Sequence, residues 1–200
     1  MTGSKPIILF LAFGLLAQCN PKPVEGGLQR YFDLDSLVSS QVENIPLQNA
    51  TLSKKIVIDR KTESKDINLD SAGWSEEFKL FSLANINKPV NWGMYTVVDK
   101  KDEHSNLHIR EYRHIEQEEA EVPFLKIWYL GDFTSTKKIH LKYVHDNIVF
   151  HSERVLKIEM DEINGETLIN RYSINGYQKL IGMDTAYYSM EGEVLFPTTR

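Results

Sequence analysis

Apolar residues follow a helical spacing in two stretches of the first half of the chain. They recur every three or four residues over about 33–47 and about 75–85, which predicts two amphipathic helices. Asp33 is a suitable N-cap for the first helix and Ser75 for the second. The expected core-facing stripes consist of Leu34, Leu37, Val38, Val42 and Ile45, with Gln41 as a polar break, and of Trp74, Phe78 and Phe81.

A different pattern is expected between the two helices. Residues 52–60 contain the β-branched run Ile56-Val57-Ile58 between charged residues, which predicts a strand. Residues 61–71 are polar and predict a loop.

After Gly93 the spacing changes to short strand-like segments. They are separated by dipeptides that reach positive φ easily, namely Asp146-Asn147, Asn164-Gly165, Asn175-Gly176 and Glu191-Gly192. Consecutive strands joined by tight turns predict an antiparallel meander. The expected strands are 94–99, 107–115, 122–130, 138–145, 148–160, 167–174, 178–184 and 186–190, with a further one near 193–196.

The strand at 122–130 indicates how the helices and the sheet combine. It is apolar on both faces except for Lys126, which predicts that both of its faces are covered. The two helices are the elements available to cover the second face. We therefore predict an α+β fold, in which a curled antiparallel sheet of about 8–10 strands carries two helices packed against its concave face.

The N-terminus has the pattern of an export signal. Residues 7–17 form an apolar run after Lys5, and this run is shorter than the roughly 20 residues that a transmembrane helix needs. Leu16-Ala17-Gln18-Cys19 follows, and Cys19 is the only cysteine. This segment resembles the lipobox of bacterial lipoproteins, although Gln18 stands where a small residue is usual. The resemblance implies cleavage before Cys19 and acylation of Cys19; a plain signal peptide or a retained anchor are the alternatives.

The domain organisation follows from this reading. Residues 1–18 are the expected signal peptide, residues 19–27 the lipidated cysteine and a flexible tether rich in proline and glycine, and residues 28–200 a single globular domain. The formal net charge of −5 argues against a nucleic-acid partner, which would require a basic surface.

Candidate catalytic or metal-binding chemistry is sparse. His140 and His151 are expected nearly opposite each other on neighbouring strands, with Glu153 nearby, and this is the best metal-like cluster; solvent-facing histidines are the alternative. Four acids at positions 116, 118, 119 and 121 indicate either a calcium-binding or docking loop, or a solvated hairpin tip. We find no known catalytic or cofactor motif, and expect neither an enzyme nor a cofactor.

Three segments together resemble an uncharacterised family of envelope lipoproteins from Bacteroidota. These segments are 31–34 (YFDL), 73–89 (GWSEEFKLFSLANINKP) and 172–179 (YSINGYQK). The resemblance implies a lipid anchor in the cell membrane or outer membrane of a double-membraned bacterium, with the domain in the periplasm or at the surface. It implies no activity.

Three functional hypotheses follow from the sequence, of which the last in rank is a hydrolase whose unrecognised site would gather His140 or His151 with carboxylates. In the first, the anchored protein binds an apolar or lipid-like ligand in a cradle between sheet and helices, because aromatic strands can line a cavity. In the second, it is a non-enzymatic scaffold or accessory subunit of an envelope protein complex.

Overall fold

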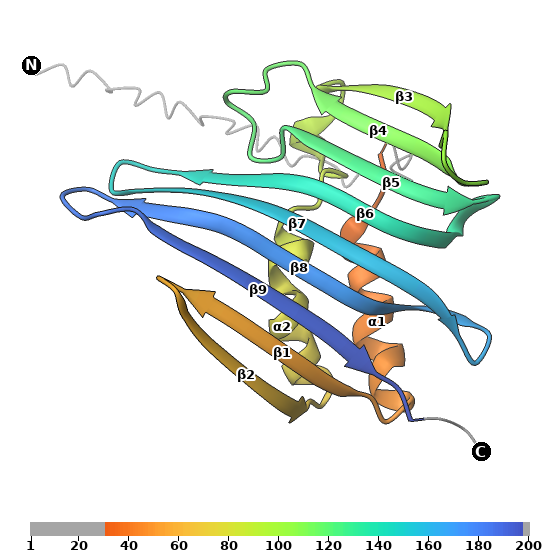
Figure 1. Cartoon of the computed structure of the whole chain (residues 1–200). Helices are drawn as coiled ribbons and strands as arrows, with labels where there is room; N and C mark the ends of the chain where they lie inside the picture. Colours follow the sequence, from red (N-terminus) through yellow and green to blue (C-terminus); the bar gives the residue numbers. More distant parts are fainter. Residues whose placement is uncertain (1–30, 198–200) are drawn as a thin grey trace, which may run out of the picture.

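The computed structural model describes residues 31–197, which form one open antiparallel sheet with two helices on its concave face (Figure 1). This confirms the predicted α+β fold. The expected signal peptide (1–18), Cys19 and the tether (19–27) lie outside the described residues. No helix within 31–197 has the length and apolarity that crossing a membrane requires.

Both α-helices have an aspartate as their N-cap residue. Helix α1 spans Leu34–Leu47, and the carboxylate of Asp33 accepts a hydrogen bond from the N–H of Ser36 at 3.1 Å, as predicted for an N-cap. Helix α2 spans Ser71–Leu83 and begins four residues before the predicted start at Ser75. Its N-cap is Asp70, which accepts from the N–H of Gly73 at 2.8 Å, so the prediction of Ser75 as the cap is wrong.

The sheet has the strand order β2-β1-β9-β8-β7-β6-β5-β4-β3. Strands β3 to β9 form the predicted meander, and the hairpin β1–β2 pairs with the last strand, so the two halves of the chain share one sheet. The strands are β1 Thr51–Ile58, β2 Lys61–Asn68, β3 Tyr95–Lys101, β4 His108–His114, β5 Phe124–Leu130, β6 Asp132–Asp146, β7 Phe150–Ile163, β8 Glu166–Leu180 and β9 Ala186–Leu195. A short 3₁₀ helix, η1 (Pro89–Asn91), precedes β3.

The prediction of a loop after residue 60 is wrong, because β2 occupies most of it. Asp59 and Arg60 have φ values of 47° and 71°, and this tight turn brings Lys61 opposite Ile58. An edge strand needs no buried face, so β2 is polar and almost entirely exposed. Its composition therefore resembles that of a loop.

Two of the predicted turns are wrong for a common reason. Strands β8 and β9 continue through Asn175-Gly176 and Glu191-Gly192, where turns were expected. A Cβ atom on Gly176 would lie 2.2 Å from the carbonyl oxygen of Glu153, so this glycine serves a close approach of two backbones. Asn164-Gly165, by contrast, does form the turn between β7 and β8, with φ values of 53° and 86°.

The core fills the space between the helices and the sheet. In the part of the central strands that the helices cover, alternate side chains face the helices and are buried. The largest contributors include Leu34, Trp74, Phe78, Leu125, Ile127, Leu141, Leu156 and Tyr172. One face of each central strand therefore lies in the core. Side chains on the opposite, open face of the sheet are covered only by side chains of neighbouring strands.

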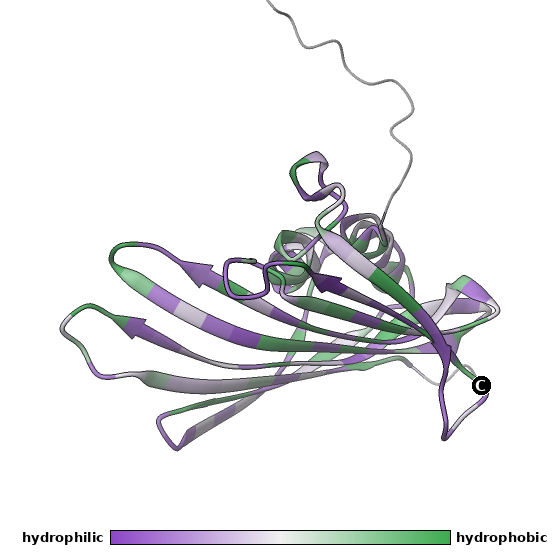
Figure 2. Ribbon diagram, turned by 90° about the horizontal axis from the view of Figure 1, so that it is seen from above, coloured by the Kyte–Doolittle hydropathy of each residue, from purple (hydrophilic) through white to green (hydrophobic). Residues whose placement is uncertain are grey.

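The expectation that β5 is covered by other elements on both faces is wrong. Leu125 and Ile127 are buried toward the helices, whereas Phe124 and Trp128 are half-buried on the open face of the sheet. The helices lie together on the other face (Figure 2). On the open face Phe124 packs edge-on against His140 of β6, with 5.3 Å between ring centroids, so a neighbouring side chain provides the cover.

Candidate functional site

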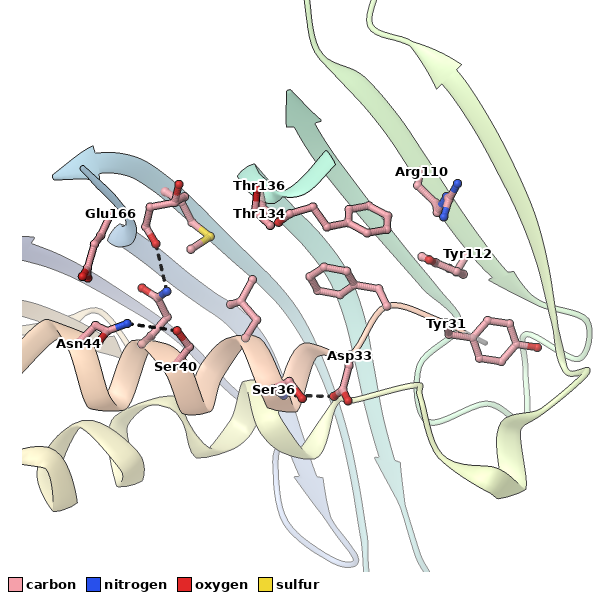
Figure 3. Close-up of a pocket in the computed structure, with 16 residues that line it drawn as sticks. Tyr31, Asp33, Ser36, Ser40, Asn44, Arg110, Tyr112, Thr134, Thr136 and Glu166 are labelled. Carbon is pink, nitrogen blue, oxygen red and sulfur yellow. Dashed lines mark hydrogen bonds between the residues drawn. The ribbon is translucent and has the colours of Figure 1, made fainter. Parts of the chain in front are cut away.

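A cleft of about 730 Å³ lies between α1 and strands β4, β6, β7 and β8 (Figure 3). Residues of α1 form one wall, and the strands form the other. The residues that lead into α1, Tyr31, Phe32 and Asp33, also line it.

The sheet side of the cleft carries the rings of Phe133 and Tyr112 together with the polar side chains of Thr134, Thr136 and Glu166 (Figure 3). Phe133 packs edge-on against Phe32, with 5.2 Å between ring centroids, and the guanidinium of Arg110 lies 5.2 Å from the centre of the Phe133 ring. Two hydrogen bonds of 2.6 and 2.7 Å join Arg110 to the carboxylate of Asp99 on β3. The hydrogen bonds from Arg110 hold the pKa of Asp99 below its usual value. The planar guanidinium of Arg110 is therefore held in place, and the carboxylate of Asp99 compensates most of its charge.

Two tyrosines form one end of the cleft. The hydroxyl oxygen of Tyr31 accepts hydrogen bonds from the N–H groups of Gly93 (2.9 Å) and Tyr95 (3.3 Å), which fixes its position. Its ring meets that of Tyr112 edge-on, at 5.8 Å. A tyrosine hydroxyl is neutral at physiological pH and can donate a hydrogen bond, and burial raises the pKa of Tyr112 further above its usual value.

The helix side of the cleft is polar. Ser36, Ser40 and Asn44 follow one another at helical spacing along α1, and the Asn44 amide donates to the Ser40 hydroxyl oxygen at 3.3 Å. Gln41 is buried next to them. Its amide donates to the carbonyl oxygen of Thr167 (3.2 Å) and accepts from the N–H of Ile169 (2.8 Å), which ties α1 to β8.

The cleft is therefore mixed in character: rings gather around Phe32 and Phe133, and hydroxyl and amide groups line α1, while Leu37 of α1 and Glu166 of β8 also face it. Among residues 31–197, those that line the cleft include no histidine. An arrangement of fixed aromatic surfaces and hydrogen-bonding groups is suited to holding a ligand that is apolar on one side and polar on the other.

The predicted pairing of His140 with His151 is wrong. The turn between β6 and β7 is centred on Ile148-Val149, which pairs His140 with Lys157 and His151 with Asp146. The two histidines are thus six residues apart along the strands, about 20 Å at 3.3 Å per residue. Among residues 31–197 no group of three or more His, Cys, Asp or Glu side chains is arranged to hold a metal ion.

The acidic loop lies away from the cleft. Glu116, Glu118, Glu119 and Glu121 are all exposed, whereas Ala120 and Val122 between and after them are buried. The N–H of Val144 donates to the carbonyl oxygen of Glu121 at 2.7 Å, which attaches the loop to β6. The loop is held by its backbone and small apolar residues, and its carboxylates face solvent.

A second polar group was missed from the sequence. Lys54 of β1 lies 2.7 Å from the carboxylate of Glu77 on α2, and the hydroxyl of Tyr172 donates to that same carboxylate. The side chains of Lys54 and Glu77 are only 17% and 11% exposed. Lys54 shares strand parity with Leu52 and Ile56, and a charge on the core-facing parity was the signal that could have identified it.

Searches with this chain against protein-family models, curated proteins and solved structures find no match. Cys19, the one site residue expected from the sequence, lies outside the described residues.

Proposed function

We propose that this chain is a lipid-anchored envelope protein that binds an amphipathic, lipid-like ligand in the cleft between α1 and the sheet. The observation that carries the proposal is the pairing of an aromatic wall, Phe32, Phe133 and Arg110, with a polar wall, Ser36 and Ser40. The volume of the cleft lies within the roughly 300–1,000 Å³ common for small-molecule sites.

The proposed anchor keeps the cleft close to a bilayer. Tyr31, at one end of the cleft, is twelve residues from Cys19 along the chain. At about 3.5 Å per extended residue, the connecting segment spans at most about 40 Å. A site held at this distance has direct access to membrane lipids and their amphipathic precursors, which supports a ligand of this class.

The ligand is expected to place its apolar part against Phe133 and its polar part toward α1. Arg110 is paired with Asp99, so it offers a largely compensated charge and a flat surface. A neutral or zwitterionic head group therefore fits better than a strongly anionic one. Tyr112 supplies a neutral hydroxyl as donor.

Native mass spectrometry of the mature chain carrying Cys19→Ser tests ligand binding without the acyl chains. We expect the protein purified from cells to carry an amphipathic lipid. Ser40→Trp should reduce bound lipid at least tenfold, because Ser40 lines the cleft and an indole at this position occupies space that the ligand needs. Ser39→Trp is the matched control, since Ser39 is exposed on the same helix but does not line the cleft. Equal occupancy in both variants, or a chain free of lipid, contradicts the proposal.

The anchor is tested separately. Cells fed labelled palmitate should incorporate the label into the wild-type chain and not into Cys19→Ser, and only the wild type should remain with washed membranes. Absence of label from the wild type contradicts the anchor and leaves the measurement on the cleft intact.

A further inference from the structure

The hairpins β6–β7 and β8–β9 end side by side at one end of the sheet (Figure 1). The N–H of Ile181 in the second turn donates to the carbonyl oxygen of Val149 in the first, at 3.1 Å. Four aliphatic side chains project from these turns into solvent, and we call them the apolar tip. They are Ile148 (92% exposed), Val149 (60%), Ile181 (73%) and Met183 (64%).

The turns themselves do not require aliphatic residues. In the first turn, the side chain of Asn147 accepts a hydrogen bond from the N–H of Val149 at 2.9 Å. In the second, Gly182 takes a φ of +75° and the N–H of Met183 donates to the carbonyl oxygen of Leu180. Polar residues at the four tip positions would fold equally well, so the exposed apolar surface points to a binding role.

The residues behind the tip are aromatic and polar. Tyr177 and Tyr187 face each other on β8 and β9, with 5.9 Å between ring centroids, and Tyr187 is exposed. Lys179 lies between them and the turn. From the extremity inward the tip presents apolar residues, then Lys179, then Tyr177 and Tyr187. Tyrosine rings occupy the head-group level of a membrane interface, and a lysine near this level can extend its charged end toward water.

We propose that the apolar tip inserts into the surface of a lipid bilayer. The tip is formed by two protruding turns, which suits insertion into a fluid layer. Asp146 ends β6 directly before the first turn, and Asp184 lies within the second turn next to Met183. Both are exposed, so insertion is limited to the apolar side chains at the extremity of the turns. The chain as a whole is acidic, with a net charge of −5, so apolar contact is the driving force and attraction to anionic lipid is not.

For an anchored chain, this contact would define how the domain is oriented on the membrane. Strands β6, β7 and β8, which carry the tip at one end, also contribute residues to the wall of the cleft, among them Phe133, Met160 and Glu166. The apolar tip is separate from Cys19 and from the cleft. Insertion is therefore tested on a chain in which Cys19→Ser removes the proposed acylation site and Ser40→Trp obstructs the cleft.

Flotation with vesicles measures the insertion directly. The mature chain with Cys19→Ser and Ser40→Trp is mixed with vesicles of phosphatidylethanolamine and phosphatidylglycerol. We expect it to float with the vesicles, and we expect Ile148→Ser with Ile181→Ser to lower the partition coefficient at least tenfold. Leu47→Ser with Val90→Ser is the matched control, because it removes two exposed aliphatic side chains outside the tip. Equal partition of the two double variants, or no flotation of the parent, overturns the proposal.

A fluorescent label reports which part of the chain enters the bilayer. Once Cys19 is replaced the chain has no other cysteine, so an environment-sensitive probe can be placed at Ile148→Cys or at Leu47→Cys. Vesicles should shift the emission of the probe at 148 to the blue and leave the probe at 47 unchanged. Equal shifts, or dimerisation of the parent that the tip serines abolish without vesicles, would assign the tip to another partner and overturn membrane insertion.

Discussion

The ring of Tyr172 on β8 lies against the backbone of Gly192, the residue directly opposite on β9. A Cβ atom on Gly192 would come within 2.1 Å of that ring. The hydroxyl of the same tyrosine donates to the carboxylate of Glu77, which also pairs with Lys54. One side chain therefore links β8, β9 and α2, and through Lys54 also β1.

Replacing Gly192 should be costly although the new side chain is small. We expect Gly192→Ala to lower the free energy of unfolding by about 2–3 kcal/mol, because the added methyl group overpacks a ring that is already buried. Urea unfolding monitored by circular dichroism measures the loss. The same substitution in a Tyr172→Leu background should cost less than 1 kcal/mol relative to its own parent, since about 2 kcal/mol of coupling is within the usual range for residues in contact. An equal loss in both backgrounds would show that the ring is not responsible.

Buried tyrosines should make the fold sensitive to alkaline pH. Burial raises the pKa of Tyr172, and the hydrogen bond to Glu77 raises it further; burial also raises the pKa of Tyr95. The native state keeps these protons after the unfolded chain has lost them, at a pKa of about 10. Each tyrosine therefore contributes stability that is complete below about pH 10 and decreases above it by about 1.4 kcal/mol per pH unit.

Denaturant unfolding between neutral pH and about pH 11 checks this sign. The free energy of unfolding should fall above pH 10, and the decrease in Tyr172→Phe should be shallower by the contribution of one tyrosine. A slope that is identical in wild type and Tyr172→Phe would contradict the assignment.

Removing one partner of the ion pair between Lys54 and Glu77 should destabilise the fold more than neutralising both partners. Lys54→Met leaves a buried carboxylate without its cation, and we expect a loss of about 3 kcal/mol. Adding Glu77→Gln should recover most of that loss, because the amide is neutral and can still accept the hydrogen bond from Tyr172. Thermal unfolding of the two variants compares them, and a double variant less stable than Lys54→Met would be incompatible with this reading.

Gln41 should protect a specific backbone amide. Gln41→Leu leaves the N–H of Ile169 and the carbonyl oxygen of Thr167 without this partner, at an expected cost of about 2 kcal/mol. Hydrogen exchange at the Ile169 amide should accelerate by the corresponding factor of about 30. Gln48→Leu is the control, because the side chain of Gln48 accepts its hydrogen bond from the exposed side chain of Asn164, and we expect this change to alter stability by less than about 0.5 kcal/mol. Unchanged exchange at Ile169 in Gln41→Leu would refute the role.

Local chemistry predicted those elements whose signals are local. Asp33 as an N-cap and Asn164-Gly165 as a turn depend on interactions within a few residues, and both are confirmed. Asp70 was overlooked because the polar stretch before it resembles a loop, although that stretch ends in a capping residue. The edge strand β2 was overlooked for the same reason.

The cleft was only partly predictable. The sequence indicated helices lying over aromatic strands, and hence a cradle, but the polar wall formed by Ser36 and Ser40 depends on how α1 is rotated against the sheet. That rotation is set by contacts such as the one between Gln41 and β8, which lie more than a hundred residues apart in the chain.

The periodicity of the chain was enough to establish two helices, an antiparallel meander and the residues that share each strand face, because these depend on neighbours along the backbone. The tertiary structure decided what each face meets. Gly176 and Gly192 belong to dipeptides that are typical of turns, yet both lie within strands. The carbonyl oxygen of Glu153 approaches Gly176 and the ring of Tyr172 approaches Gly192, so neither position has room for a side chain. Such approaches are set by packing between elements, and no pattern within one segment records them.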